Sequence, residues 1–283
     1  MRELLIASRP LSWINTAFPF AAAYLLGGGG IDLAFVLGTM FFLVPYNLAM
    51  YGINDVFDYE SDLRNPRKGG VEGHLATPDQ HSRILIAAVV ACVPFLVYLF
   101  VIGSWLSNAV LVLSMFAVVA YSVKGLRFKE IPVLDSVTSS IHFSSPAWFG
   151  LALLGQPLDG DAWLILGAFF LWGVASQAFG AVQDVLPDRE GGLKSVATAF
   201  GARATVRLAT VVYLAAGVLL VLTFWPVQLA GLLALPYALN TGRFWSITDA
   251  TSADAHRGWR VFLWLNYVVG FLVTMLMIWT ALR

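Results

Sequence analysis

Residues 54–70 of the chain read NDVFDYESDLRNPRKGG, a dense run of oxygen-bearing side chains directly after an apolar segment. In this stretch Asn54, Asp58 and Asp62 are spaced four residues apart. On an α-helix each step of four advances about 6 Å along the axis and about 40° around it, so the spacing predicts one stripe of side chains. Crowded carboxylates need a counter-charge, and oxygen ligands suit Mg²⁺. We therefore interpret the stripe as a candidate magnesium site.

The same spacing recurs in QDVLPDREGGLK, residues 183–194, where Asp184 and Asp188 are also four residues apart. Each lies 126 positions after its counterpart, Asp58 or Asp62, and both stretches continue into a basic residue and two glycines. Solvated acids at a helix end are the plain alternative for one such patch, but they give no reason for the repeat. Two facing carboxylate pairs that hold Mg²⁺ are what binding of a diphosphate requires.

The composition indicates an integral membrane protein. Hydrophobic residues make up 59% of the chain and charged residues 12%, about half of the charged share of soluble domains. The formal net charge of zero gives no support for nucleic-acid binding, and the single cysteine, Cys92, allows no disulfide within the chain. Arg2 and Arg9 precede an apolar run without a signal-peptide cleavage site, so we expect that run to be the first membrane helix.

Nine segments are apolar over most of the roughly 20 residues that a helix needs to span a bilayer. They cover residues 11–28, 32–53, 83–103, 105–123, 135–155, 161–182, 204–223, 225–242 and 259–281. We predict an all-α membrane protein with nine transmembrane helices, arranged as two related four-helix halves plus one helix. We expect residues 1–283 to form a single transmembrane domain.

The basic residues predict the orientation. Of the 17 Lys and Arg residues, all but Arg283 lie before the first predicted helix or beside the connections that follow even-numbered helices. The positive-inside rule makes that side cytoplasmic. Both acidic motifs fall on the same side, at the ends of the second and sixth helices. We therefore predict a multi-pass protein of the cell membrane whose active site faces the cytoplasm, between the two halves.

A third connection on that side, YSVKGLRFKEIPVLD at residues 121–135, carries Lys124, Arg127 and Lys129. A diphosphate has more charge than the metal alone neutralises, so cations are expected near it. The alternative is that these residues serve the positive-inside rule and nothing more, which applies most to Lys129.

Three motifs carry a resemblance to a known family. NDVFDYESD resembles the NxxxDxxxD signature of the UbiA superfamily of intramembrane prenyltransferases, QDVLPDREGGLKSVATAFG resembles its second DxxxD signature, and YSVKGLRFK resembles its YSxxxLRxK loop. The resemblance implies two Mg²⁺ ions that bridge an isoprenoid diphosphate. The implied metal ligands are Asn54, Asp58, Asp62, Asp184 and Asp188. The basic residues we assign to the diphosphate are Arg67, Lys68, Lys124, Arg127 and Lys194.

Within that superfamily, four stretches resemble the actinobacterial lycopene elongases: SRPLSWINTAFPF, PYNLAMYGINDVFDYESDLRNPRKGGVEG, FFLWGVASQAFGAVQDV and RVFLWLNYVVG. This implies dimethylallyl diphosphate as donor, lycopene as acceptor and a carotenoid cyclase as a candidate partner. There are departures from the wider superfamily. The chain has NPRKGGVEG where aromatic-ring prenylators are rich in arginine, and it has Leu186 and Pro187 between the second pair of aspartates. We infer fewer metal ligands there and regard Asp62 as the least secure ligand of the first motif.

The expected chemistry begins with a leaving diphosphate, stabilised by Mg²⁺ and cations. The allylic cation that remains needs shelter from water and electron-rich aromatic faces. Tyr51 and Tyr121 are candidates for this role, and interface tyrosines are the alternative. For the final base, Glu60, His74 and the released diphosphate all stay open. We expect His142, a lone histidine on an apolar helix, to be a packing residue.

Other functional classes fit less well. A transporter would carry acids near the middle of the membrane, whereas these cluster at one face. Within the enzymes, the alternative is a prenyltransferase acting on an aromatic or quinone precursor. Whether the product is hydroxylated is left open by the sequence.

Overall fold

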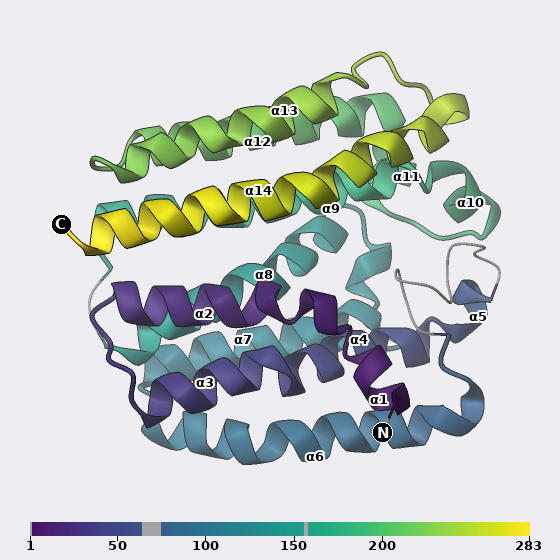
Figure 1. Ribbon diagram of the computed structural model, residues 1–283. Helices are drawn as coiled ribbons and strands as arrows, with labels where there is room; N and C mark the ends of the chain where they lie inside the picture. The colour runs from purple at the N-terminus through teal and green to yellow at the C-terminus, as the bar shows by residue number, and fades with distance from the viewer. Residues whose placement is uncertain (1, 64–74, 156–157) are drawn as a thin grey trace. The chain divides into compact units, whose positions relative to one another are not determined.

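The computed structural model describes residues 2–63, 75–155 and 158–283, and the regular elements there are all helical (Figure 1). The chain divides into two compact units, called here the N-terminal unit (Met1–Phe128 and Ile141–Pro157) and the C-terminal unit (Lys129–Ser140 and Leu158–Arg283). Helix α8, Leu134–Leu153, begins in the C-terminal unit and ends in the N-terminal unit. The all-α prediction is confirmed for the described residues.

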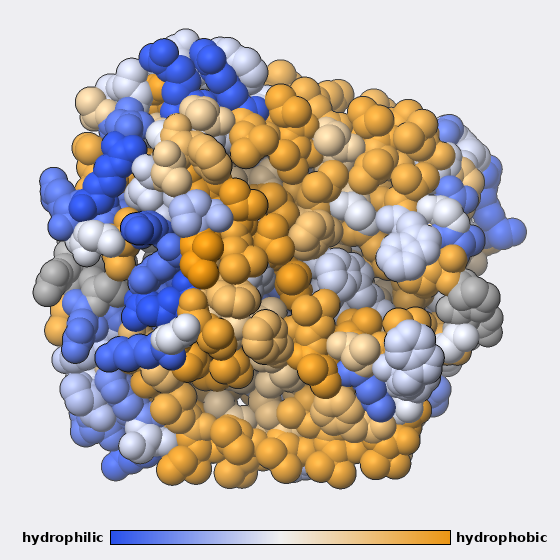
Figure 2. All heavy atoms as spheres, turned by 180° about the vertical axis from the view of Figure 1, so that it is seen from behind, coloured by the Kyte–Doolittle hydropathy of each residue, from blue (hydrophilic) through white to orange (hydrophobic). Residues whose placement is uncertain are grey.

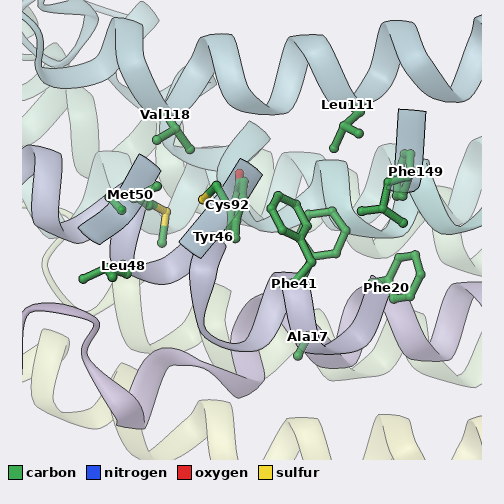
Figure 3. Close-up of a cluster of buried hydrophobic side chains, with 14 of the residues drawn as sticks. Ala17, Phe20, Phe41, Tyr46, Leu48, Met50, Cys92, Leu111, Val118 and Phe149 are labelled. Carbon is green, nitrogen blue, oxygen red and sulfur yellow. The ribbon is translucent and has the colours of Figure 1, made fainter. Parts of the chain in front are cut away.

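The N-terminal unit is built around α4, which packs against α6 and α7, while α2 packs against α3. Phe20, Phe41, Tyr46 and Phe149 are buried in its core, where their rings lie against one another (Figure 3). Besides the end of α8, its helices are α1 Arg2–Ala7, η1 Pro10–Ser12, α2 Ile14–Leu26, α3 Leu33–Leu43, α4 Pro45–Phe57, α5 Tyr59–Asp62, α6 Pro78–Ile102 and α7 Trp105–Ser122.

The C-terminal unit has α12 at its centre, packed against α9 and α13, with α14 against α9 and α13. A second aromatic core holds Tyr213, Tyr237 and Phe262. The short η2, Phe128–Glu130, precedes α8. The remaining helices are α9 Gly160–Val182, α10 Val185–Glu190, α11 Val196–Phe200, α12 Ala202–Val221, η3 Val227–Leu233, α13 Ala234–Gly242, η4 Asp249–Asp254 and α14 Ala255–Ala281.

A helix overlaps each of the nine predicted ranges, but these helices differ in length and in how apolar they are. In the part of the chain that the structure describes, six segments are long and apolar enough to cross a membrane. They are Leu33–Phe57, Pro78–Ile102, Trp105–Ser122, Gly160–Val182, Ala202–Val221 and Asp249–Ala281. Hydrophobic residues cover the middle of the face shown in Figure 2, and hydrophilic residues gather at its edges. The count of nine spans stays a prediction.

The second predicted segment is interrupted at Val44, where α3 ends and Pro45 begins α4. Proline suits the first position of a helix because it has no N–H to leave unpaired there. Backbone carbonyls beside such a break need donors inside a membrane. Thr16 Oγ1 donates to the carbonyl of Phe42 at 2.6 Å, and Asn47 Nδ2 donates to the same carbonyl at 2.8 Å. Two buried side chains thus satisfy the interrupted backbone.

Candidate active site

The first acidic motif lies at a break between two helices. Helix α4 ends at Phe57, Asp58 follows with φ −100° and ψ −3°, and α5 begins at Tyr59. The prediction that Asn54, Asp58 and Asp62 lie on one continuous helix is therefore wrong. Short polar side chains form local hydrogen bonds that compete with helix propagation, and Asn54 Nδ2 donates to Asp58 Oδ2 at 2.8 Å at this point.

The second acidic motif has the same local form. Helix α9 ends at Val182, and α10 begins at Val185 directly after Asp184. The backbone of Asp184 has φ −100° and ψ 2°, nearly the angles of Asp58. The two aspartates that the sequence relates by spacing thus occupy equivalent corners, each between a long helix and a short one.

Around Asp58 the N-terminal unit gathers a small polar group. Asn54 Nδ2 also donates to Ser122 Oγ at 3.0 Å, which ties α4 to the end of α7. Arg127 Nη2 lies 3.8 Å from Asp58 Oδ1 as an ion pair. Asp58 is buried, with an exposed fraction of 5%. The structure therefore brings Asn54, Asp58 and the predicted cation Arg127 together.

The loop that delivers Arg127 has an unusual backbone. Gly125 has φ 95° and Arg127 has φ 42°, both in the left-handed region. A residue other than glycine adopts this backbone conformation at a cost of order 1 kcal/mol, and such residues cluster at functional sites. Arg127 adopts this unfavourable backbone conformation at the point where its guanidinium lies beside Asp58.

A second ion pair beside the first motif was not predicted from the sequence. Arg9 Nη2 lies 2.8 Å from Asp55 Oδ1, and Asp55 is fully buried. The Arg9 guanidinium also lies over the ring of Tyr51, 4.2 Å from the ring centroid. One face of Tyr51 therefore already carries a cation, and its role toward an allylic cation stays a prediction. No local pattern relates residues 46 positions apart.

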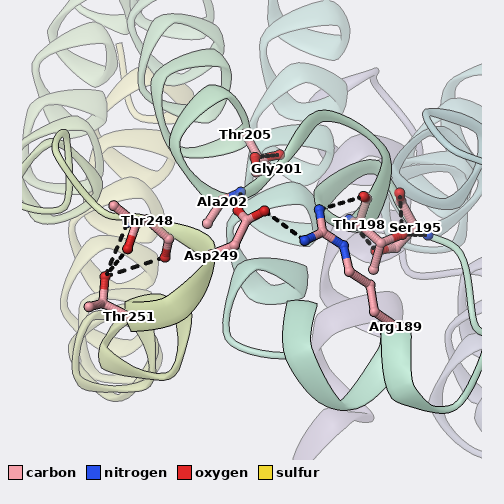
Figure 4. Close-up of polar contacts among 9 residues, drawn as sticks. All are labelled: Arg189, Ser195, Thr198, Gly201, Ala202, Thr205, Thr248, Asp249 and Thr251. Atoms are coloured by element: carbon pink, nitrogen blue, oxygen red, sulfur yellow. Dashed lines mark hydrogen bonds and ion pairs between the residues drawn. The ribbon is translucent and has the colours of Figure 1, made fainter.

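The second motif is held at its rim by another long-range pair (Figure 4). Arg189 Nη1 lies 2.7 Å from Asp249 Oδ2, and Arg189 Nη2 donates to the carbonyl of Thr198 at 2.9 Å. Asp249 Oδ1 accepts from the backbone N–H of Ala202 at 2.7 Å. The Ala202 N–H and the Arg189 guanidinium hold the pKa of Asp249 below its usual value. These bonds fix the segment that follows Asp188.

Asp135, at the start of α8, links two elements of the C-terminal unit. It is buried, and its Oδ2 accepts from the backbone N–H of Val196 at 2.8 Å. Its Oδ1 accepts from the N–H of Ser136 at 2.7 Å. Asp135 thereby ties the start of α8 to the start of α11, just after Lys194.

The other predicted site residues are placed as follows. Asp188 is half-buried, whereas Lys124 and Lys194 are exposed. The ring of Tyr121 meets the ring of His142 edge to face, with centroids 5.1 Å apart. Arg67, Lys68, His74 and the side chain of Asp62 lie outside the described residues.

The described residues contain no group of three or more His, Cys, Asp or Glu side chains close enough to hold a metal. Asp58 belongs to the N-terminal unit and Asp184 to the C-terminal unit, so the structure describes each half of the predicted site separately. The donor chemistry of the first half fits Mg²⁺. Asn54 directs its amide nitrogen to Asp58 and Ser122, so its carbonyl oxygen is the atom that could act as a ligand.

Comparison with known proteins shows the family to which the chain belongs. The UbiA prenyltransferase family matches residues 16–268, and the chain belongs to that family. It is 55% identical over 278 residues to a lycopene elongase/hydratase of Corynebacterium glutamicum, covering 98% of this chain and 97% of that protein. It is 56% identical over 283 residues to the C(50) beta-cyclic carotenoids biosynthesis protein LbtBC of Dietzia sp., covering all of this chain and 66% of the relative.

Solved structures show the same fold. A UbiA homolog from Archaeoglobus fulgidus bound to DMAPP and Mg²⁺ matches with a TM-score of 0.68 at 19% identity, covering 94% of this chain and 98% of that chain. The apo structure of a UbiA homolog from Aeropyrum pernix matches with a TM-score of 0.66 at 20% identity, covering 94% of this chain and 99% of that chain. The chain therefore has the UbiA membrane fold.

Proposed function

We propose that the chain transfers dimethylallyl groups from dimethylallyl diphosphate to the ends of lycopene, on the route to fifty-carbon carotenoids. The observation that carries the transfer chemistry is the repeated corner: Asp58 and Asp184 sit at equivalent helix breaks with nearly equal backbone angles. The names of the relatives from Corynebacterium and Dietzia support the acceptor. The DMAPP and Mg²⁺ bound by the Archaeoglobus homolog support the donor and the metal.

Each residue of the candidate site has a distinct role in the proposed transfer. Bound Mg²⁺ would supply positive charge to the leaving diphosphate, as metal ions do in related departures. Asn54, Asp58, Asp184 and Asp188 would hold it. Arg127, 3.8 Å from Asp58, adds a fixed cation for the diphosphate oxygens. The terminal double bond of lycopene then attacks the allylic carbon, and Tyr121, next to Ser122 in the chain, would offer an aromatic ring to the allylic cation.

Three polar residues of the membrane helices favour an apolar acceptor. A hydroxylated aromatic acceptor would need a buried hydrogen-bonding partner, because an unpaired polar group is costly to bury. Three of the residues that could serve are engaged within the protein. Ser176 bonds Tyr213 at 3.0 Å, Gln177 Oε1 accepts from Ser139 at 3.0 Å, and Asn266 Oδ1 accepts from Tyr237 at 2.9 Å. A hydrocarbon makes no such demand, and its recognition rests on shape and burial.

The proposal includes the arrangement in the membrane. Nine helices would form two related halves plus one, with both acidic motifs and the loop of Lys124 and Arg127 at the cytoplasmic face. A carotenoid cyclase remains a candidate partner. The Dietzia relative, whose name refers to beta-cyclic carotenoids, is longer than this chain, which is consistent with an associated cyclisation step.

The test is expression in bacteria that accumulate lycopene. The intact chain should convert the pigment to products one or two five-carbon units larger, detected by chromatography and mass spectrometry. The matched control is Asp58→Asn with Asp184→Asn, which keeps the size of both side chains and removes both charges. Unchanged lycopene with the intact chain, expressed and inserted in the membrane, would contradict the acceptor.

A further inference from the structure

His142 is a titratable side chain near the middle of α8 that the proposed mechanism has not used. Its exposed fraction is 3%, and its Nε2 has no hydrogen-bond partner among the described residues of the N-terminal unit. Buried polar atoms are nearly always hydrogen-bonded, so an exception calls for an explanation. The sequence led us to expect a packing residue, and a bare ring nitrogen does not fit that role.

The surroundings of the ring determine which nitrogen is available. The backbone of Ala117 forms the hydrogen bond to the imidazole, and a carbonyl can only accept. The nitrogen that faces it therefore carries the proton, and Nε2 keeps its lone pair. Tyr121 contacts the ring through an edge-to-face arrangement with an angle of 77°. No titratable group of opposite charge is among the contacts described for this ring in its own unit.

His142 is linked to the first motif through two short paths. Tyr121, in contact with the ring, precedes Ser122, which accepts from Asn54. Tyr46 donates to the backbone carbonyl of His142 at 3.3 Å, and Tyr46 and Asn54 both lie on α4. Eight residues of helix correspond to about 12 Å. His142 is thus connected to α4, which carries Asn54, and to the end of α7, which carries Tyr121 and Ser122.

We propose that Nε2 of His142 accepts the proton released when the reaction ends, an inference that rests on the proposed function. Attack by the double bond of the acceptor forms a carbon–carbon bond and leaves a tertiary carbocation on the acceptor. In one ending, an adjacent C–H bond breaks, its electron pair forms a new double bond, and the proton goes to Nε2. In the other, a water oxygen forms a C–O bond to the cation and its proton goes to Nε2. Either route balances without an oxidant.

If His142 accepts the proton, substitutions of His142 should impair carotenoid formation but not the release of diphosphate. His142→Gln keeps a hydrogen-bonding group but cannot take up the proton, and His142→Phe keeps a ring against Tyr121. Both should still release diphosphate from dimethylallyl diphosphate. Elongated carotenoid formed per diphosphate released should fall by about tenfold or more, since a positioned general base contributes a factor of order 10² to 10⁴. The variants are compared at equal amounts of folded protein in detergent.

His81→Gln is the matched control, because His81 also lies on a helix and bonds the carbonyl of Ala76 at 2.9 Å. It should leave the ratio unchanged. A purely structural role for His142 would lower diphosphate release and carotenoid together, and that parallel loss would overturn the inference, as would an unchanged ratio. His142→Asn provides a third variant, and any of the three that folds decides the outcome. If the unaltered chain forms no elongated carotenoid, the proposed function itself fails.

Discussion

At the scale of single residues, Asp58 and Asp184 are placed by local geometry. Each follows the last turn of a long helix, and each adopts φ near −100° with ψ near zero. Each aspartate thus lies at the end of a long helix, directly before a short helix begins. Spacing within the sequence related these two positions, and both have the same local geometry, although the continuous helix that the spacing assumed is interrupted at Asp58.

We predict that Asp58→Ala and Asp184→Ala each lower turnover by a factor of order 10² or more, because each removes an acid that would hold the metal against the developing charge. Turnover is measured as carotenoid formed in reconstituted membranes, with and without a chelator. Glu190→Ala is the control, since Glu190 is exposed on the same short helix as Asp188. Near-normal turnover in either aspartate variant would show that the two motifs do not act as a pair.

The pair of Arg9 and Asp55 provides a second prediction. Removing Arg9 would leave Asp55 fully buried with its charge uncompensated by that partner, which costs about 3 kcal/mol in comparable pairs. Arg9→Met should therefore lower the midpoint of thermal unfolding, and adding Asp55→Asn should restore part of the loss. The comparison uses the protein in one detergent throughout. A double variant no more stable than Arg9→Met would contradict the pairing.

At the scale of elements, several helices are interrupted, and side chains form hydrogen bonds to the backbone groups left unpaired beside the interruptions. Pro45 divides the second membrane segment, and Thr16 and Asn47 satisfy the carbonyl of Phe42 beside it. The backbone N–H groups at the starts of α12 and α11 are satisfied in a similar way, by Asp249 and Asp135. In both regions a bond between distant residues replaces the regular backbone bonds of a longer helix.

The bonds that Asp249 makes to Arg189 and to the N–H of Ala202 predict that the stability of the fold depends on pH. The Ala202 N–H and Arg189 lower the pKa of Asp249 in the folded state, so its contribution to stability is present above the unfolded value of about 4. It is lost as the pH falls through the folded value. The unaltered chain should unfold at a higher temperature than Asp249→Asn at pH 7, and the difference should shrink below about pH 4.

The control for this prediction lies on the same short helix, η4. Asp254 is more exposed and lies 3.7 Å from Arg257, so Asp254→Asn should change the unfolding temperature little at either pH. A difference between the unaltered chain and Asp249→Asn that stays constant from pH 7 to acid would show that charge at Asp249 plays no part.

At the scale of the whole molecule, the helices could be predicted from local sequence patterns, whereas contacts between distant residues could not. Apolar runs gave the helices, and the spacing of Asn54 and Asp58 gave two side chains that the structure brings together. The partners of Asp55 and Asp249 were not predicted, because they lie 46 and 60 residues away and share no periodic pattern with them. The break at Pro45 could have been predicted, since proline favours the start of a helix.

Topology gives a prediction for the entire chain. With Cys92 replaced by alanine, Gly160→Cys should react with a membrane-impermeant thiol reagent added from outside, and Glu190→Cys only after the cytoplasmic face is opened. Gly160 suits the test because a side chain there would meet nothing within 4 Å, and Glu190 is exposed. Labelling in the reverse pattern would put the acidic motifs on the outer face and contradict the orientation.

The central claim is that a prenyl group goes to a hydrocarbon acceptor, and one measurement tests it directly. The purified chain is reconstituted in lipid with Mg²⁺ and radiolabelled dimethylallyl diphosphate, and lycopene and 4-hydroxybenzoate are offered together. Because the polar residues Ser176, Gln177 and Asn266 are engaged within the protein, we predict label in elongated carotenoid and none in the aromatic acid. Label in prenylated 4-hydroxybenzoate with lycopene unchanged would contradict the acceptor and leave the ionisation chemistry alone.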